Sequence, residues 1–523
     1  MYLRLLLFTL LCSTFTLQAQ DRYVDEVFDS VIVSSDNLYG ANITIITGQP
    51  SLDSLYFDIY MPAGDTATKR PVVLVSHTGT FLPRGLAAPT GDRDDFANVA
   101  ACQALAKRGF VAISYSYRLG WNPQAPSDVA RRAQLLQAAY RGIQDTYSLI
   151  RFLNMTVDNF GNPYALDTDK VAMYGIGTGG FLATNMHALD DWRTEVFIDK
   201  FRDPVYGVPF IDTTLLGDLE NTMPGFLDIG GGNLIPFNIP LHVGFKEDFH
   251  FSFSLDGGLG DSSWMETGNQ DIPMALVGVV DHPTTPFGLD PITGDINCDL
   301  PVFTGAGTEF FVVNIAGTGC VAKKANELGY NSVFEDITWD DELSNQLRTY
   351  EHAQEHLWAI PSDGPEAGPW EYWDSTFWKM IPSINPLFPN IHAAGIATNP
   401  NMSLAQATAY SDTAVQFFAP RACVALGLEC GLSSGVKQLV EEDYNFNMYP
   451  NPASGEVNFR VEGDQRITKV TLYDMYGRLI NSTSDIEAYT HSMDVSNIPP
   501  GVYAVRVELG DRGFLSAKLM VQN

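Results

Sequence analysis

The first part of the chain switches repeatedly between two spacings of its apolar residues, and each spacing predicts a different element. Residues 55–60 alternate apolar and polar side chains as a half-buried strand does, whereas residues 71–77 form a β-branched run typical of buried parallel strands. Apolar side chains three and four residues apart predict helices at 94–108 and 127–154. Further strands are expected at 111–117 and 170–174. This alternation predicts an α/β fold with a mostly parallel sheet and helices on both faces.

The pattern becomes irregular in two places, which we interpret as insertions into this fold. Residues from about 190 to 250 are rich in Gly, Pro and Asp, and a second irregular stretch covers about 340–395. Strand patterns return at 250–255 and 273–281, and helix patterns at 320–329 and 403–421. Pro420 is expected to end the last helix. The α/β domain is therefore predicted to span 21–431.

Beyond residue 431 the composition changes, and short strand patterns replace the α/β alternation. Residues 432–445 have the composition of a linker, and residues 446–523 carry short alternating runs separated by turn residues. The clearest runs are 470–474, 475–480 and 501–507. We expect residues 446–523 to form a small all-β sandwich.

The N-terminal residues 1–20 have the pattern of a secretory signal peptide. Arg4 precedes the apolar run Leu5–Leu11, and the segment T-L-Q-A-Q follows before Asp21. No later stretch has 18 or more consecutive apolar residues, so an exported protein, soluble or attached to a surface, is expected. The formal net charge of −31 argues against nucleic-acid binding, which needs a basic surface.

Export makes disulfide bonds chemically accessible, and five cysteines remain once Cys12 leaves with the signal peptide. Cys423 and Cys430 are close enough in sequence to close a small loop, and Cys298 with Cys320 is a second candidate pair. Cys102 lies in a helical pattern and is expected to be a buried free thiol. The sequence alone leaves this connectivity open.

Residues 446–523 resemble the sorting domain of the bacterial type IX secretion system, of the kind found in Bacteroidetes. The matching segments are Y-P-N-P-A-S-G (449–455), V-T-L-Y-D-M-Y-G-R-L-I (470–480), I-P-P-G-V-Y-A-V-R-V (498–507) and S-A-K-L-M-V (516–521). The resemblance implies that the type IX machinery carries the protein across the outer membrane. It further implies removal of this domain, followed by surface anchoring or release.

Residues 50–190 resemble secreted α/β-hydrolases of the esterase, lipase and dienelactone-hydrolase kind. The matching segments are L-Y-F-D-I-Y-M-P (55–62), R-P-V-V-L-V-S-H-T-G-T-F (70–81), V-A-I-S-Y-S-Y-R (111–118) and the glycine turn after 174. The resemblance implies an oxyanion loop at His77 and Gly79, although Thr78 and Thr80 replace glycines of the H-G-G-G-F pattern. A small ester or a polymer is the implied substrate, and no cofactor is expected.

The glycine turn matches the nucleophile elbow of such enzymes in every feature except the nucleophile. The elbow pattern is G-x-S-x-G, and Gly175, Gly177 and Gly179 occupy its fixed positions. Glycine has no side chain to attack a carbonyl, so a conventional acyl-enzyme route is closed at Gly177. Thr178 becomes the candidate nucleophile if the register of the turn shifts by one residue.

The same turn also satisfies the dinucleotide fingerprint G-x-G-x-x-G through Gly175, Gly177 and Gly180. Residues 195–199 would then form a second strand that places Asp199 at about the expected distance. Against this alternative, the fingerprint normally follows the first strand of its fold, and several strands precede it here.

The remaining members of a triad are assigned from their order along the chain. Asp281 ends a predicted strand and takes the position of the acid, and His392 precedes the closing helix and takes that of the base. His352 and His356, four residues apart, are alternative bases. We do not expect them to bind zinc, because the order H-E-x-x-H is missing.

Two weaker patterns complete the candidate sites. Asp295, Asn297 and Asp299 alternate like the start of a calcium loop but lack its following glycine and late glutamate. An aromatic cluster is expected from Trp358, Trp370, Tyr372, Trp373 and Trp378, either as packing of an insertion or as a surface that stacks on sugars. Two hypotheses remain: an ester-directed hydrolase, or an inactive hydrolase fold that serves as a surface binding or structural module.

Overall fold

The computed structural model describes residues 21–46, 50–86, 88–266, 272–290, 293–304, 310–335, 337, 339, 341–348, 353–361, 366–384, 390–430, 444–462, 466–474, 479–484, 486–509 and 513–522. The predicted signal peptide and most of the predicted linker lie outside the described residues. The chain divides into two compact units, Met1–Ser332 with Glu342–Cys430, and Val333–Asp341 with Gly431–Asn523.

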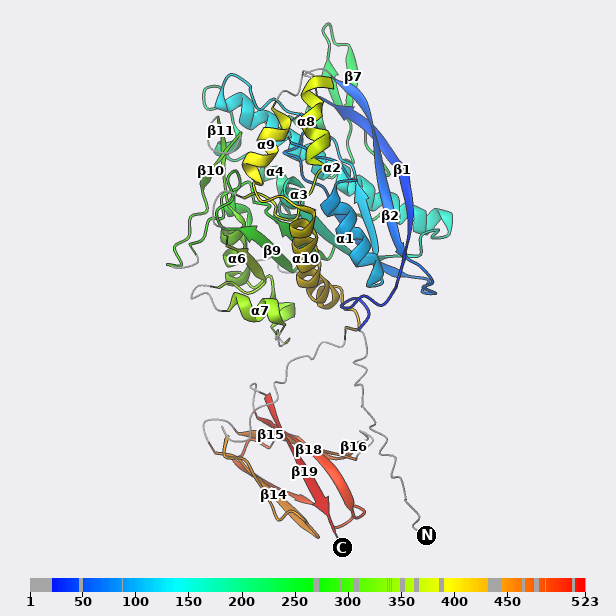
Figure 1. Ribbon diagram of the computed structural model, residues 1–523, viewed down its shortest axis with the longest axis vertical. Coiled ribbons are helices and arrows are strands. Elements are labelled where there is room, and N and C mark those ends of the chain that lie inside the picture. The colour runs from blue at the N-terminus through cyan, green and yellow to red at the C-terminus, as the bar shows by residue number, and fades with distance from the viewer. Residues whose placement is uncertain are drawn as a thin grey trace, which may run out of the picture. The chain divides into compact units, whose positions relative to one another are not determined.

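The first unit is built on an eight-stranded sheet with the order β1-β2-β4-β3-β5-β8-β9-β12 (Figure 1). Its strands are β1 (Val31–Thr44), β2 (Ser51–Pro62), β3 (Arg70–Ser76), β4 (Val111–Tyr115), β5 (Leu166–Ile176), β8 (Phe251–Leu255), β9 (Met274–Val279) and β12 (Leu357–Ile360). β1 and β2 are antiparallel to their neighbours, and all pairs from β4 to β12 are parallel. The predicted mostly parallel sheet is confirmed. The sequence did not reveal β1, whose first half is largely exposed and carries no clear apolar alternation.

Ten helices lie among the described residues around this sheet. They are α1 (Phe96–Lys107), α2 (Asp128–Phe160), α3 (Thr178–Ala188), α4 (Trp192–Glu195), α5 (Thr213–Leu216), α6 (Thr318–Glu327), α7 (Glu342–Leu347), α8 (Ser375–Ile384), α9 (Ile391–Thr398) and α10 (Leu404–Ala425). No helix among the described residues is long and apolar enough to span a membrane.

Helices cover both faces of the sheet, as β5 demonstrates. Met173 belongs to the apolar cluster that includes Leu149 of α2 and Leu182 of α3. The next residue, Tyr174, packs its ring against Phe418 of α10, with centroids 5.2 Å apart. Because successive side chains of a strand point to opposite faces, α2 and α3 cover one face and α10 the other.

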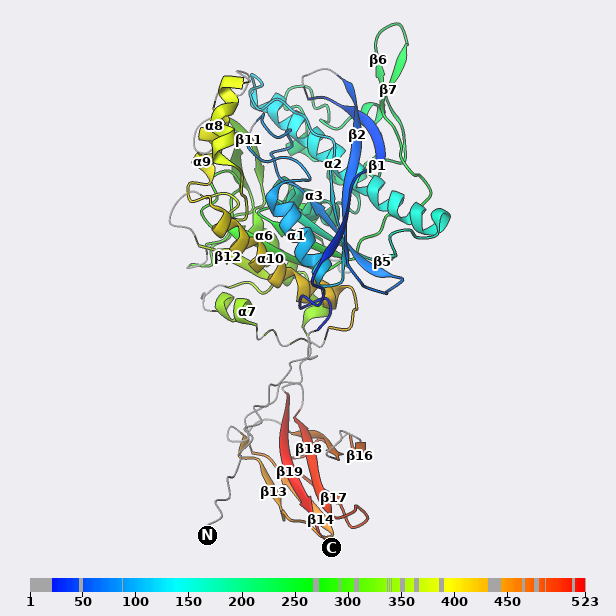
Figure 2. The ribbon, with the colours of Figure 1, turned by 45° about the vertical axis from the view of Figure 1, so that its right-hand side comes forward.

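The two predicted insertions supply structure at the edge of this core. Between 190 and 250 the chain forms α4, α5 and the hairpin of β6 (Gly225–Asp228) and β7 (Leu234–Asn238), which extends away from the sheet in Figure 2. A further hairpin pairs β10 (Leu300–Phe303) with β11 (Phe311–Ile315). In the second insertion α8 and α9 pack together, on the side of the unit that also holds β11 (Figures 1 and 2).

The prediction that Pro420 ends the closing helix is wrong, because α10 continues through Pro420 to Ala425. A proline inside a helix removes one backbone hydrogen bond and costs about 3 kcal/mol. Pro420 is buried beside Phe417 and Phe418, whose side chains are fully covered. Packing against the sheet therefore keeps this helix intact where its local sequence favours a break.

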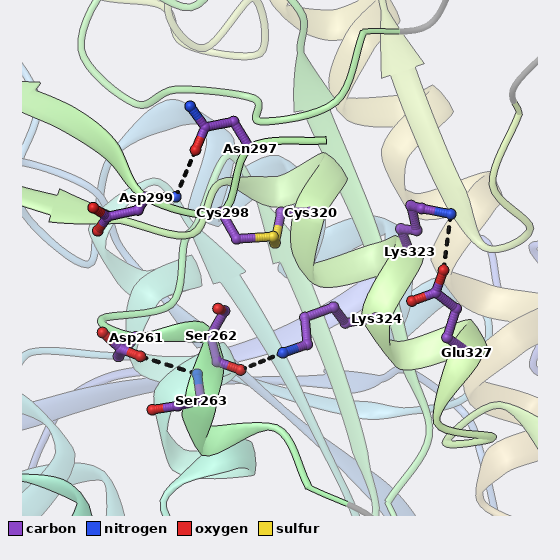
Figure 3. The surroundings of a disulfide bond; sticks show 10 residues. All are labelled: Asp261, Ser262, Ser263, Asn297, Cys298, Asp299, Cys320, Lys323, Lys324 and Glu327. Carbon is purple, nitrogen blue, oxygen red and sulfur yellow. Dashed lines mark hydrogen bonds and ion pairs between the residues drawn. A yellow bond between two sulfur atoms is a disulfide. The ribbon is translucent and has the colours of Figure 1, made fainter. Parts of the chain in front are cut away.

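Both expected disulfide bonds are present. Cys298 is bonded to Cys320, which joins the segment before β10 to α6 (Figure 3), and Cys423 is bonded to Cys430. Cys102 is a buried free thiol in α1, as predicted.

The second unit contains two antiparallel sheets. One has the order β13-β14-β17, with β13 (Asn447–Tyr449), β14 (Glu456–Arg460) and β17 (Thr490–Asp494). The other has the order β16-β15-β18-β19, with β15 (Ile467–Tyr473), β16 (Leu479–Thr483), β18 (Gly501–Leu509) and β19 (Gly513–Val521). Val457 and Phe459 of β14 share one buried cluster with Val505 and Val507 of β18. The predicted all-β domain is therefore confirmed.

Candidate active site at the glycine elbow

The glycine turn joins β5 to α3 at the carboxyl end of the sheet. Gly177 precedes the first residue of α3 and has φ 53° and ψ −113°, which is a strained conformation for any residue with a side chain. Its N–H donates to the carbonyl oxygen of Leu255 at 2.7 Å. A Cβ on Gly175 would lie 2.5 Å from Gly180 Cα, and one on Gly179 would lie 2.7 Å from Ser76 Oγ. The turn therefore needs glycine on both sides and holds Gly177 at a sharp strand-to-helix corner, as an elbow does.

The space beside Gly177 is occupied by the side chain of Thr78. A Cβ built on Gly177 would lie 3.0 Å from Thr78 Cβ and would collide with Thr78 Oγ1. A serine at position 177 therefore cannot be accommodated without displacing Thr78. The loop that resembles an oxyanion loop thus places its own hydroxyl where the side chain of a nucleophile would begin.

His77 ties this loop to Tyr117, which lies just after β4. His77 is buried, and its Nδ1 donates to the carbonyl oxygen of Thr78 at 2.6 Å. Its ring stacks on Tyr117 with centroids 4.4 Å apart, and the Tyr117 hydroxyl donates to the His77 carbonyl at 2.7 Å. Burial lowers the pKa of His77 to about 4, so the ring is neutral at physiological pH. Thr178 Oγ1 lies 3.3 Å from the Tyr117 hydroxyl.

A cavity of about 490 Å³ opens beside the elbow, and we call it the elbow cavity. Thr78, Gly79, Gly177 and Thr178 line it on one side. Its walls are mainly apolar and include Phe81, Trp121, Leu135, Leu136, Phe181, Trp264, Val313 and Trp370. α9 closes another side through Ala394, Gly395 and Thr398. Both insertions therefore contribute to the cavity.

Two acids and a histidine that are not among the sequence-predicted site residues line the elbow cavity: Asp256, Glu371 and His282. Asp256 follows β8, His282 follows β9, and Glu371 lies between β12 and α8. Burial raises the pKa values of Asp256 and Glu371 to about 8 each, and nearby carboxylates add to the rise at Glu371. Burial also lowers the pKa of His282 to about 3. At neutral pH the cavity therefore contains two largely protonated acids and a neutral imidazole.

His282 is held in one orientation. Its Nδ1 accepts the backbone N–H groups of Thr284 at 3.1 Å and Thr285 at 2.8 Å. The proton of the neutral ring is therefore on Nε2, which lies 3.8 Å from Asp256 Oδ2. A histidine whose Nδ1 already accepts two hydrogen bonds, and whose Nε2 carries a proton, has no lone pair left to deprotonate a hydroxyl.

The structure does not bring the predicted triad together. Asp281 is exposed and lies outside the cavity lining, whereas its neighbour His282 lines the cavity. His392 Nε2 is 2.6 Å from Ser375 Oγ, a contact between α9 and the start of α8. His356 precedes β12, and its Nδ1 accepts from Arg421 Nε at 3.3 Å. It therefore lies at the amino end of the strand, away from the elbow. His352 lies outside the described residues.

The residues of the predicted calcium loop form hydrogen bonds and an ion pair with neighbouring residues. Asp299 forms an ion pair with Lys200 at 3.3 Å and accepts from Asn314 Nδ2 at 2.9 Å, and Asn297 Oδ1 accepts the Asp299 N–H (Figure 3). Thr293 Oγ1 donates to Asp295 Oδ2 at 3.0 Å. No group of three or more His, Cys, Asp or Glu side chains in the described part of the chain is arranged to hold a metal ion.

The predicted aromatic cluster is divided among several places. Trp370 is buried in the wall of the elbow cavity, and Trp373 and Trp378 pack with Ile391 in a small cluster beneath α8. The Trp358 ring stacks on Tyr410, and Tyr372 meets Phe96 edge-on. These contacts show packing of an insertion, and Trp370 is the member that faces the cavity.

The dinucleotide alternative finds no structural support in this turn. Residues 195–199, its expected second strand, begin at the end of α4, and Asp199 begins a 3-10 turn. Among the described residues, β1 to β4 precede β5, the strand that leads into the glycine turn.

Comparison with known families gives two matches in separate parts of the chain. Residues 447–522 match the family described as the secretion system C-terminal sorting domain, and residues 57–204 match the family described as BD-FAE. The chain carries an esterase-like α/β-hydrolase domain and a secretion-system sorting domain. The sorting domain supports export by type IX secretion to the cell surface or extracellular space and implies interaction with that machinery.

Several solved structures that align with this chain are described as esterases. Est2, described as a novel thermophilic esterase from Thermogutta terrifontis, has 12% identity over 68% of this chain and 93% of its own, with a TM-score of 0.29. Brefeldin A esterase, described as a bacterial homologue of human hormone sensitive lipase, has 18% identity over 33% and 40%, with a TM-score of 0.21. Esterase B from Lactobacillus rhamnosis has 17% identity over 50% and 69%, with a TM-score of 0.26. No curated protein matches the chain. At these identities and TM-scores nothing follows about the activity of the hydrolase-like domain.

Proposed function

We propose that the hydrolase-like domain binds a small, largely apolar ligand in the elbow cavity and forms no acyl-enzyme at its elbow. One observation carries the proposal. Gly177 has the backbone geometry of the elbow corner but no side chain, and Thr78 fills the space that a nucleophile would need. A hydroxyl nucleophile also needs a base within hydrogen-bond reach, and the histidine that lines the cavity, His282, already accepts two backbone N–H groups at Nδ1.

The size and lining of the elbow cavity support the proposal that this domain binds a small ligand. Its volume of about 490 Å³ lies within the range of small-molecule sites, and its lining combines apolar walls with few polar groups. The sorting domain would deliver this binding site to the cell surface or the medium, after the inferred signal peptide at residues 1–20 has directed the chain across the inner membrane.

Ester hydrolysis from Thr178 is the alternative, because the Thr178 side chain does line the elbow cavity. In that mechanism Thr178 would act with Asp281 and His392. The alternative predicts turnover that depends on the Thr178 hydroxyl, whereas the binding proposal predicts none.

The two are separated by assaying the purified protein on a series of short acyl esters beside Thr178→Ala and His392→Ala. We expect hydrolysis at the rate of the buffer alone for all three proteins, with unchanged melting temperatures. Turnover by the parent protein that is lost in Thr178→Ala would contradict the binding proposal. Turnover that survives in both variants would also contradict it and would exclude Thr178 as the nucleophile.

A further inference from the structure

Three side chains that line the elbow cavity have a buried polar atom without a hydrogen-bond partner among the described residues: Arg132 at Nε, Trp370 at Nε1 and Asp256 at Oδ2. Of the three, only Asp256 carries an acceptor, its carboxyl. This side chain is 3% exposed, and its Oδ1 accepts the Val279 N–H at 2.7 Å. Its Oδ2 makes no hydrogen bond with any described residue, although it lies at a cavity large enough for a ligand. A buried polar atom without a partner is costly, so native structures normally provide one.

The groups around Asp256 present hydrogen-bond donors to it. The Val279 N–H donates to Oδ1, and His282 Nε2, which carries the proton of the neutral ring, lies 3.8 Å from Oδ2, beyond hydrogen-bond distance. Burial raises the pKa of Asp256, and the nearby Gly368 N–H, like that of Val279, opposes this rise. A surrounding made of donors suits a carboxylate that accepts, and a ligand that fills the cavity would complete it with a further donor.

A second acid, Glu371, lines the same cavity without a countercharge from the cavity wall. The negative charges of Asp256 and Asp95 both raise its pKa, and a hydrogen bond from Thr90 opposes that rise. Asp95 has its own partner in Arg84, at 2.7 Å.

The cationic side chain in the described lining is Arg132, and it is already engaged. Its Nη2 lies 3.2 Å from Asp128, and its Nη1 donates to the carbonyl oxygen of Lys200. Asp256 and Glu371 therefore face the cavity without a compensating positive charge in its lining.

The rest of the lining suits an apolar body. Phe81, Trp121, Trp264 and Trp370 contribute aromatic surface, and aromatic faces attract organic cations. A divalent metal would instead need about six oxygen ligands, which a largely apolar wall does not supply.

We propose that the elbow cavity binds an organic molecule with a protonated primary amine on an apolar body, with the ammonium group beside Asp256 and Glu371. This inference rests on the proposed binding function and names its ligand class. The ammonium donates to the free Oδ2 of Asp256 and supplies the positive charge that the two acids lack.

Binding of such a cation is coupled to proton release. Asp256 and Glu371 have pKa values of about 8 in the empty cavity, so at pH 6 an ammonium group must displace a proton to form an ion pair. His282 stays neutral over this range, since its pKa is about 3. For one proton released, the affinity rises about tenfold per pH unit between pH 6 and 8 and then levels off until the amine loses its own proton near pH 10.

The test is titration calorimetry of the full chain with 2-phenylethylamine and with 2-phenylethanol, which has the same body and no charge. We expect the amine to bind at least about tenfold more tightly than the alcohol at pH 8, with affinity that rises from pH 6 to 8 and with proton release. Asp256→Asn and Glu371→Gln should each lower the amine affinity at least about tenfold, because each leaves the ammonium without one countercharge. Asn keeps an acceptor for the Val279 N–H and cannot ionise, so this variant should melt at pH 6 at a temperature at least as high as that of the parent.

Asp281→Asn is the matched control, since it removes an exposed carboxyl one residue from His282 and should leave the amine affinity unchanged. Equal affinities for amine and alcohol, or amine affinity that falls from pH 6 to 8, would overturn the ammonium inference and leave the binding function intact. Failure of the amine to bind would also overturn the inference, whereas ester turnover would instead contradict the proposed function itself.

Discussion

At the scale of single residues, the account depends on Gly177 and Thr78. The glycine at 177 could be located from the G-x-G-x-G pattern alone, and the structure places it at the corner between β5 and α3. The role of Thr78 could not be found in this way, because it depends on where a loop nearly a hundred residues earlier crosses the elbow.

Gly177→Ala should destabilise the domain by about 2 kcal/mol. Alanine at position 177 must keep the positive φ of Gly177, and its methyl group must displace the Thr78 side chain. Thr78→Ala removes the collision with Oγ1 and leaves only the 3.0 Å contact with the Cβ of residue 78, so in this background the cost of Gly177→Ala should fall by about 1 kcal/mol. Urea unfolding of the four proteins of this cycle measures both values.

Gly161→Ala is the control for this cycle. Gly161 ends α2 with φ 71°, and a Cβ there would meet nothing within 4 Å. Gly161→Ala should therefore lower the free energy of unfolding only through its backbone conformation, and by the same amount with or without Thr78→Ala. A fully additive effect of Gly177→Ala and Thr78→Ala would contradict the proposed overlap of the two side chains.

Asp256 should make stability depend on pH with a definite sign. Its pKa rises from an unfolded value near 4 to about 8 on folding, so its favourable contribution is complete below about pH 4 and is lost as the pH rises to 8. Asn cannot ionise, so Asp256→Asn does not lose stability in this way as the pH rises. Relative to the parent, the variant should therefore gain roughly 1 kcal/mol per pH unit between pH 5 and 8, and nothing further above pH 8.

Thermal and denaturant unfolding at pH 5, 6, 7, 8 and 9 checks this prediction, with Asp281→Asn as the exposed control. A stability difference that stays constant from pH 5 to 8 would show that Asp256 is ionised in the folded protein throughout.

Of the two cavity acids, one could have been found from the order of the predicted strands along the sequence. Asp281 ends a predicted strand and therefore takes the acid position in the sequence pattern, and Asp256 directly follows another predicted strand, 250–255. Carboxyl ends of parallel strands meet at one edge of a sheet, so Asp256 was accessible to this reasoning. Glu371 was not, since it lies in an irregular insertion whose path is set by packing.

At the scale of elements, strong apolar periodicity predicted most of the hydrolase-like core. The strands at 71–77, 111–117 and 170–174 and the helix at 94–108 all correspond to observed elements. β1 and the continuation of α10 beyond Pro420 were missed for one shared reason. Their structure comes from tertiary contacts, through pairing with β2 and through packing on the sheet, and leaves little local signal.

The disulfide between Cys298 and Cys320 links a hairpin of the cavity wall to α6, whose Lys324 also donates to the Ser262 carbonyl (Figure 3). Replacing both cysteines with alanine should lower stability by about 3 kcal/mol, because the bond closes a loop of 22 residues in the unfolded chain. Replacing Cys423 and Cys430, which are 7 residues apart, should cost about 1 kcal/mol less.

Denaturant unfolding under non-reducing conditions measures the free energy of unfolding of both double variants. Cys102→Ala is the control, because it removes a thiol and no disulfide bond. Equal losses for all three variants would show that packing of the cysteine side chains, rather than loop closure, determines the effect.

At the scale of the whole molecule, the two units have separate cores and separate tasks. The hydrolase-like domain has its own buried cluster, and the sorting domain has another. Sequence resemblance was most specific for the sorting domain, where four short segments recur in order, and the family match at 447–522 agrees with it.

Truncation after Cys430 should abolish export while leaving the first unit folded. In a host with a type IX system, we expect the full chain on the cell surface or in the medium and the truncated chain in the periplasm. The truncated protein should keep the thermal unfolding transition of the hydrolase-like domain. Equal amounts of both chains outside the cell would contradict the role assigned to the sorting domain.

Intact-mass spectrometry after treatment with a fluorophosphonate, a reagent that labels activated hydroxyl nucleophiles, shows whether the elbow has a nucleophile. A serine esterase in the same tube serves as the positive control. The account predicts that the esterase is fully labelled and that this protein keeps its unmodified mass. One stoichiometric adduct on this protein, mapped to Thr178 or Thr78, would contradict it.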